Sequence, residues 1–323
     1  MSTMREVAAL AGVSGKTVSR VINGDRYVSA AVQERVEQAV KTLDYVPNML
    51  SQTFRTGRDS AIGIAVPDLA DPFFGALIQA VFVLARRRST AVLVTALGQD
   101  PADERPALEA LLRRHVAGLI IAPVAGDQSY LRNWLPNTEI VFVDRPPRRL
   151  AADSVIEDDL GGAGLAIRHL LSRGNRRIAF LGNESAVLTT GRRFQGYRSA
   201  LEKAGVGVAP ELVQLYNETG SNAVAALRTL LDLTDPPSAI FSADSQSSIA
   251  VVPLLHSLRR TDIDFVSFGD FPMAAALDPP VTVLDQNPTS LGRAAAARLF
   301  ERIDQPGQRR KRQQVLPVEL KIR

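Results

Sequence analysis

Short apolar strands alternate with helical stretches from residue 61 almost to the end of the chain, and this alternation constrains the fold more than any other feature. The predicted strands are rich in β-branched residues, and they cover residues 61–66, 91–95, 118–122, 140–143, 177–181, 239–242, 265–267 and 281–284. Helical stretches at 73–88, 103–114 and 128–135 separate the first four. Strands that are apolar on both faces form parallel sheets covered by helices on each side. Two such series predict an α/β architecture of two doubly wound parallel-sheet subdomains.

Polar and aromatic side chains directly follow these predicted strands. In open parallel sheets, ligands bind in the crevice outside the carboxyl ends of the strands. The residues at those positions are DLADPFF at 68–74, Asp144-Arg145, Asn183-Glu184, Asp244-Ser245 and Gly269-Asp270, and Arg192-Arg193 open the helix after RIAFLG. Each carboxylate taken alone is better explained as a turn or capping residue. The set as a whole favours a cleft for a polyhydroxylated or otherwise polar small molecule.

The first sixty residues have a different pattern, with three short helices in succession. Thr3 and Glu6 form a capping box for a helix over residues 4–10, and Gly12 ends it. Ser14 caps a second helix, and a third starts after Ser29 with one apolar stripe. Two short helices joined by a tight turn and completed by a third are a helix-turn-helix unit. A small helical bundle with a solvated basic face is the alternative that spacing alone leaves open.

The second helix of a helix-turn-helix unit enters the DNA major groove with its N-terminal residues at the base edges. The predicted base-reading residues are Gly15, Lys16 and Arg20, because Lys and Arg can donate to guanine. The residues predicted to bond phosphates are Ser14, Thr17, Ser19 and Asn23.

Residues 3–58 closely resemble the DNA-binding headpiece of the LacI/GalR (lactose/galactose repressor) family of bacterial transcription regulators. The matching text is V-A-x-x-A-G-V-S-x-x-T-V-S-R-V-I-N-G at 7–24, V-S at 28–29 and L-D-Y-V-P-N at 43–48. The resemblance implies that Lys16 and Arg20 read bases and that Gly15 occupies the third reading position.

The same resemblance identifies residues 47–59 as a hinge helix and linker; composition alone allows a plain linker. The family's P-N-x-x-A-R-x-L reads P-N-M-L-S-Q-T-F here, so Ser51 replaces the alanine, Gln52 the arginine and Phe54 the leucine. Apolar wedges kink DNA from the minor groove, and the resemblance assigns that role to Phe54 with Ser51 beside it.

Further matches lie in the α/β region, at D-P-F-F (71–74), V-D-R (143–145), R-R-F-Q-G-Y (192–197) and L-D-P-P-V-T-V (277–283). They resemble the family's effector-binding domain, which is similar to periplasmic sugar-binding proteins. The resemblance implies effector contacts from Asp71, Phe73, Phe74, Asp144, Arg145, Arg193, Asp244 and Asp270. Two motifs depart from the family: its N-D reads Ala243-Asp244 here, and its G-F/Y-D-D reads S-F-G-D at 267–270.

Three regions follow from these patterns. They are a DNA-binding domain at 1–46, the hinge and linker at 47–59, and an effector-binding domain at 60–323. Within the last, we expect an N-subdomain of about 60–156 and 287–314 and a C-subdomain of about 157–286 and 315–323, with a single last strand from Val315 to Ile322.

Composition excludes several classes of protein. The chain of 323 residues has no cysteine, which excludes disulfides and thiolate metal sites. It has neither a signal peptide nor an apolar run that could span a membrane, so we expect a soluble cytoplasmic protein. No catalytic motif is present, and the three histidines lack metal-ligand spacing, so we expect no enzyme activity, no cofactor and no metal.

We therefore expect a homodimeric transcriptional repressor that binds double-stranded operator DNA and is controlled by a sugar or sugar derivative. The alternative is a sugar-binding protein or sensor without operator-specific DNA binding. A periplasmic solute-binding protein would need a signal peptide, and a sugar-modifying enzyme would need an activated nucleophile or base.

Overall fold

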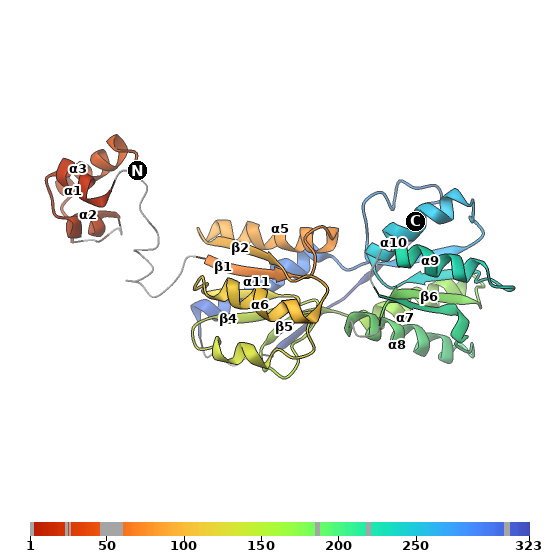
Figure 1. The fold of residues 1–323 in the computed structure, drawn as a ribbon. Coiled ribbons are helices and arrows are strands. Elements are labelled where there is room, and N and C mark those ends of the chain that lie inside the picture. Colours follow the sequence, from red (N-terminus) through yellow and green to blue (C-terminus); the bar gives the residue numbers. More distant parts are fainter. Residues whose placement is uncertain are drawn as a thin grey trace. The chain divides into compact units, whose positions relative to one another are not determined.

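The computed structural model describes residues 3–22, 25, 27–45, 61–184, 188–217, 221–306 and 311–323. The chain divides into two compact units, Met1–Asp59 and Ser60–Arg323 (Figure 1). The predicted hinge residues Ser51 and Phe54, and the predicted phosphate contact Asn23, lie outside the described residues. Among the described residues, no helix combines the length and apolar composition that a membrane crossing requires.

The first unit contains the three predicted helices, α1 (Met4–Ala11), α2 (Gly15–Ile22) and α3 (Ala30–Thr42). The capping box at α1 is present, since Glu6 N donates to Thr3 Oγ1 and Thr3 N donates to Glu6 Oε2. Val7, Val18 and Val36, one from each helix, are fully buried together. A shared apolar core thus holds the three helices in one small domain.

The second unit contains two six-stranded sheets, each in a separate lobe (Figure 1). The first sheet is entirely parallel, in the order β11-β5-β4-β3-β1-β2. Its strands are β1 (Ala61–Val66), β2 (Ala91–Ala96), β3 (Gly118–Ile121), β4 (Glu139–Val143), β5 (Asp153–Glu157) and β11 (Gln313–Leu316). Around it lie α5 (Pro72–Arg87), α6 (Pro101–Leu112), the 3-10 helix η1 (Ser129–Asn133) and α11 (Pro288–Asp304).

The second sheet has the order β12-β10-β9-β8-β6-β7, and only its edge strand β12 is antiparallel. Its strands are β6 (Ile178–Asn183), β7 (Val213–Tyr216), β8 (Ala239–Ser242), β9 (Asp264–Phe268), β10 (Thr282–Asp285) and β12 (Glu319–Lys321). Its helices are α7 (Asp159–Ser172), α8 (Leu188–Lys203), α9 (Ser221–Leu231) and α10 (Ser245–Ser257). The predicted α/β class with two doubly wound subdomains is confirmed.

The end of the chain differs from the prediction. Instead of one last strand from Val315 to Ile322, the chain forms β11 in the first sheet and β12 in the second. Leu316 and Val318 lie on either side of the crossing. The prediction was wrong because Pro317 interrupts an apolar run that reads as continuous. The chain therefore crosses between the lobes after β5, after β10 and after β11.

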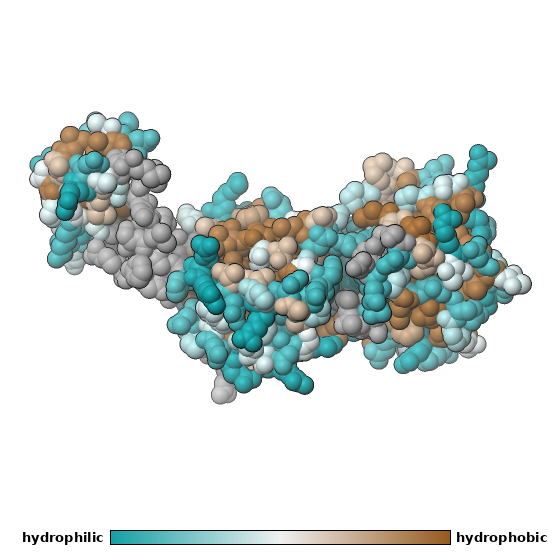
Figure 2. Space-filling model, in the orientation of Figure 1, coloured by the Kyte–Doolittle hydropathy of each residue, from teal (hydrophilic) through white to brown (hydrophobic). Residues whose placement is uncertain are grey.

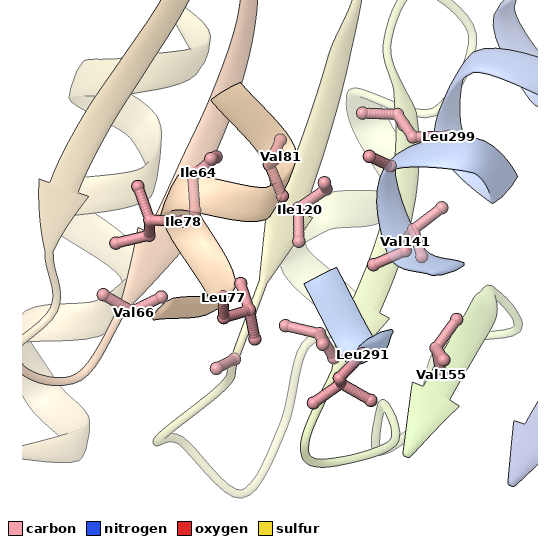
Figure 3. Packing of buried hydrophobic residues seen from close by; sticks show 14 of the residues in the cluster. Ile64, Val66, Leu77, Ile78, Val81, Ile120, Val141, Val155, Leu291 and Leu299 are labelled. Carbon is pink, nitrogen blue, oxygen red and sulfur yellow. The ribbon is translucent and has the colours of Figure 1, made fainter. Parts of the chain in front are cut away.

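The core of the first lobe forms where α5 and α11 pack side by side on the sheet (Figure 3). Leu77 of α5 and Leu291 of α11 are fully buried there. The two helices approach closely at Gly292, where an added Cβ would lie 2.3 Å from the Leu77 carbonyl oxygen. Only glycine permits this spacing without a shift of the backbone.

Gly292→Ala should lower the free energy of unfolding by about 1–3 kcal/mol, because the added methyl group meets backbone rather than a movable side chain. Gly75→Ala is the matched control, since this exposed glycine of α5 has no heavy atom within 4 Å of the added Cβ. The control should be neutral or stabilising by up to about 1 kcal/mol. Urea unfolding of both variants measures the difference, and equal stabilities would contradict the close approach.

Candidate functional site

The N-terminal end of α2 carries the predicted DNA contacts. Ser14 precedes the helix, and its Oγ accepts a hydrogen bond from Thr17 N at 3.2 Å. A Cβ added at Gly15 would meet nothing within 4 Å. Lys16 and Arg20 are exposed, and Arg20 Nε lies 3.3 Å from Asp25 Oδ2. A basic and sterically open surface therefore lies on α2.

A polar cleft with about 630 Å³ of empty space, part of it open to solvent, lies between the two lobes. Seven of the eight predicted effector residues line it, and they come from both lobes: Asp71, Phe73, Phe74, Asp144, Arg145, Arg193 and Asp244. The first five follow strands of the first sheet, and the last two belong to the second lobe. We call this cavity the central cleft.

Asp71 and the two phenylalanines lie at the start of α5. Asp71 caps the helix by accepting a hydrogen bond from Phe73 N at 2.9 Å. The Phe73 and Phe74 rings pack edge to face with their centroids 5.0 Å apart. The cap thus places a carboxylate and two aromatic rings together at the cleft.

Asp144 and Arg145 follow β4 directly. Asp144 adopts a left-handed backbone conformation with φ of 65°, which is uncommon outside glycine and is enriched at functional sites. Arg145 Nε lies 3.1 Å from Asp144 Oδ2, and Arg145 Nη1 donates to the Pro123 carbonyl at 3.0 Å. This sharp turn holds a carboxylate and a guanidinium side by side.

Arg193 is buried, with only 5% of its surface exposed, and it is held from three directions. Its Nε donates to Asp159 Oδ1 at 2.8 Å, and its Nη1 donates to the Ala243 carbonyl at 2.7 Å. The guanidinium carbon lies 3.9 Å from the centroid of the Phe268 ring, which is a cation–π geometry. Such a fixed guanidinium is a preorganised donor for a ligand oxygen.

Three buried carboxylates lie near this one arginine: Asp144, Glu157 and Asp159. Burial raises the pKa of Asp159 to about 6, although Arg193 pulls it down. Burial and the charges of Asp144 and Asp159 raise the pKa of Glu157 well above its ordinary value. Glu157 Oε2, Asp159 Oδ2 and Asn183 Oδ1 are buried oxygens without a hydrogen-bond partner among the described residues. Of these three residues, only Asn183 is on the lining of the central cleft, where its oxygen can accept a hydrogen bond from a ligand.

Asp270, the eighth predicted effector residue, is absent from the lining of the central cleft. Its carboxylate is bound to the guanidinium of Arg323, with Nη2–Oδ2 at 2.6 Å and Nη1–Oδ1 at 3.0 Å. Asp244 does line the cleft, but both of its oxygens accept hydrogen bonds from Ser247 as the cap of α10.

Several residues of the central cleft escaped the sequence prediction: Gln99, Thr189, Thr190, Gln246 and Gln286. Gln246 Nε2 donates to Asp68 Oδ2 at 3.1 Å and so joins the two lobes across the cleft. Gln286 directly follows β10 at a crossing and lies two residues after the predicted strand 281–284, which was the available signal. Thr189 and Thr190 had no comparable signal.

A helix-turn-helix domain joined to a two-lobed α/β domain with a polar cleft defines a ligand-responsive DNA-binding protein. Residues 3–48 match the family "Bacterial regulatory proteins, lacI family", and residues 167–323 match the periplasmic binding protein-like domain. The HTH-type transcriptional regulator CelR of Thermobifida fusca is 32% identical over 93% of this chain and 92% of its own length. The chain therefore belongs to the LacI family, and it is a transcriptional regulator and not an enzyme.

Two solved structures show the same architecture. The lac repressor dimer bound to operator and the anti-inducer ONPF has a TM-score of 0.87 and 26% identity, covering 99% of this chain and 97% of that one. A transcriptional regulator CelR–cellobiose complex has a TM-score of 0.72 and 30% identity, covering 100% of this chain and 99% of that one.

The carboxyl of Asp71 gives the protein a pH dependence that can be measured. Burial raises the pKa of Asp71 to about 6. The hydrogen bond from Phe73 N lowers this pKa, and the negative charges of Asp244, Asp144 and Asp68 raise it further. The native state therefore holds this proton up to about pH 6, whereas the unfolded chain loses it near pH 4. Stability from this group is lost as the pH rises through this window.

Asp71→Asn keeps a capping side chain and removes the titration. Between pH 4 and 7 the free energy of unfolding should therefore fall less in this variant than in the parent protein, by a difference of up to about 3 kcal/mol. Asp100→Asn, at the exposed cap of α6, is the control and should follow the parent protein. Urea unfolding at several pH values tests this, and parallel curves for Asp71→Asn and the parent would refute it.

Proposed function

We propose that this protein is a cytoplasmic repressor that binds operator DNA as a homodimer and changes its operator affinity when a sugar or sugar derivative occupies the central cleft. The observation that carries the proposal is one chain with a helix-turn-helix surface and a ligand-sized polar cleft. The relatives support it, because one similar structure is a dimer on operator DNA and another holds cellobiose. A sugar sensor without operator-specific binding remains the competing function.

In this proposal the DNA contacts divide into two kinds. Gly15, Lys16 and Arg20 read base edges, and Ser14, Thr17, Ser19 and Asn23 bond phosphates. Ser51 and Phe54 act in the minor groove, with Phe54 as the apolar wedge. A pseudo-palindromic operator takes one headpiece at each half-site, because a single headpiece makes few base contacts.

Binding-site selection on the full-length protein tests the operator function. Arg20→Ala should relax the preference at one base position by about 1–3 kcal/mol, because a bidentate donor is lost. Gly15→Tyr should change the preferred base, since the open space at Gly15 admits a side chain that can reach the groove. Gly15→Ala serves as the folding control. A parent protein without any operator preference would favour the sensor function, and unchanged selection by Gly15→Tyr would remove Gly15 from the reading surface.

The central cleft suits a polyol. Carboxylates accept hydroxyl hydrogens, Arg145 and Arg193 donate to oxygens, and the rings of Phe73 and Phe74 offer apolar faces. Occupancy that favours a closed arrangement of the lobes changes operator affinity by linkage, and operator changes effector affinity by the same factor.

The dimer contact is proposed at the edge of the first sheet. β2 is an edge strand of apolar sequence, yet Leu93 and Val94 are exposed, as are Phe82 and Val83 of the adjacent α5. Hydrophobic atoms gather over α5 and β2 in Figure 2. Exposed apolar strands at a sheet edge are normally covered by a partner, and a second copy of this chain supplies a matching apolar surface.

Val94→Glu should weaken the dimer by about tenfold or more, because it places two like charges in an apolar contact. Leu215→Glu is the matched control, since Leu215 is a similarly exposed residue of β7, the edge strand of the second sheet. Sedimentation velocity over a concentration series measures the effect. If Leu215→Glu dissociates the protein and Val94→Glu does not, the contact lies on the second lobe instead.

A further inference from the structure

A second cavity adjoins the central cleft and opens further along the space between the lobes. It shares Gln99, Arg145 and Asn183 with the central cleft, so the two are continuous. It holds about 1080 Å³ of empty space, against about 630 Å³ for the central cleft, and both volumes include space open to solvent. We call it the outer pocket.

The walls of the outer pocket come from both lobes. On the first lobe they include the segment after β3, residues 123–126, and Arg148. On the second lobe they include Asn183 at the end of β6 and Tyr216 at the end of β7. A ligand unit in this pocket would therefore contact both lobes, as one in the central cleft does.

The wall after β3 is preorganised by a buried carboxylate. Glu104 of α6 is fully buried and accepts hydrogen bonds from Val124 N at 2.6 Å, Ala125 N at 2.7 Å and Tyr130 Oη at 2.7 Å. Gln128 donates to the same carboxylate and accepts from Arg148 N at 2.8 Å. Charge-assisted hydrogen bonds of this kind hold a loop in one conformation. The loop at residues 123–126 is thus held in one conformation, and this wall of the outer pocket is rigid.

The chemistry of the outer pocket differs from that of the central cleft. Pro101, Pro123 and Pro146 contribute rigid apolar surfaces, while Asn217 and Arg148 contribute polar groups. Arg148 makes no ion pair within the described part of the chain, and the exposed Glu184 lies on the same lining. Apolar faces with scattered polar groups of both signs suit an uncharged ring that carries hydroxyl groups.

We propose that the effector has two units, with one polar unit in the central cleft and a second, uncharged, hydroxyl-bearing ring in the outer pocket. A disaccharide is the simplest compound of this class. The inference rests on the proposed effector function, and it adds the size and the charge of the ligand to it.

Gly126→Trp tests the inference by filling the outer pocket. An added Cβ at this exposed glycine would meet only Arg148 Nη1, at 3.9 Å, so the backbone has room for a side chain. Gly207→Trp is the matched control, because Gly207 is exposed, has no heavy atom within 4 Å of its added Cβ and lies outside both cavities. Arg148→Ala is a second variant that removes only an exposed side chain.

Calorimetric titration of the full-length protein should compare each disaccharide with its own monosaccharides. The probes are cellobiose and maltose with glucose, lactose with galactose and glucose, and xylobiose with xylose. At least one disaccharide should bind about tenfold or more tightly than its monosaccharides. Gly126→Trp should remove that advantage and leave monosaccharide binding unchanged, Arg148→Ala should reduce it, and Gly207→Trp should match the parent.

The inference is overturned if monosaccharides bind as tightly as every disaccharide, if no disaccharide binds, or if Gly126→Trp keeps the advantage. An operator-release assay with the same sugars separates this failure from that of the proposed function. Release by a monosaccharide alone would overturn the two-unit ligand and leave the sugar-controlled repressor standing. An operator complex that responds to none of these sugars overturns the two-unit ligand, and it also removes these sugars as effectors.

Discussion

The buried guanidinium of Arg193 is the interaction on which the effector domain is organised. It ties together the start of α7 through Asp159, the end of β8 through the Ala243 carbonyl, and β9 through the ring of Phe268. A buried ion pair adds little net stability, because desolvation offsets the attraction, but losing one partner leaves an uncompensated charge. The pair therefore fixes one arrangement of the second lobe. In it, the Arg193 guanidinium lies at the cleft, and the chain crossing that follows β5 is held beside it.

That anchor makes the cleft a place where charge and lobe position depend on each other. Asp144 belongs to the first lobe, Glu157 ends β5 at the crossing, and Asp159 begins the second lobe, yet all three carboxylates lie near Arg193. Arg145 pairs with Asp144 and Arg193 with Asp159, whereas Glu157 makes no ion pair among the described residues. Burial raises the pKa of both Glu157 and Asp159. Protonation of these carboxylates and the relative position of the two lobes are therefore coupled.

The sequence predicted the strands with continuous apolar, β-branched runs, including β2, whose side chains are largely exposed in the structure. It missed β5 and β7, whose sequences DSVIE and VQLY mix polar and apolar residues. Seven of the eight predicted effector residues line the central cleft. Six of them follow strands whose carboxyl ends converge, and the seventh, Arg193, lies within α8. Asp270 does not line the cleft. Its carboxylate instead binds Arg323, which follows β12 and is distant from Asp270 in the sequence. The end of a strand can be predicted from the local sequence. The ion-pair partner of a carboxylate cannot, because that partner can come from any part of the chain.

The α2 surface and the central cleft differ in how much their residues contribute to the stability of the fold. On α2, the predicted base-reading residues Gly15, Lys16 and Arg20 are at least partly exposed, and the three-helix core lies behind them, so we expect substitutions there to change stability little. In the effector domain, Arg193 and Asp159 are buried, so we expect a substitution of either residue to lower stability as well as to change the cleft. The outer pocket lies between these extremes. Its wall is fixed by buried Glu104, but Gly126 and Arg148 at its rim are exposed. Substitutions at Gly126 and Arg148 should therefore change the shape of the outer pocket while leaving the buried contacts of Arg193 intact.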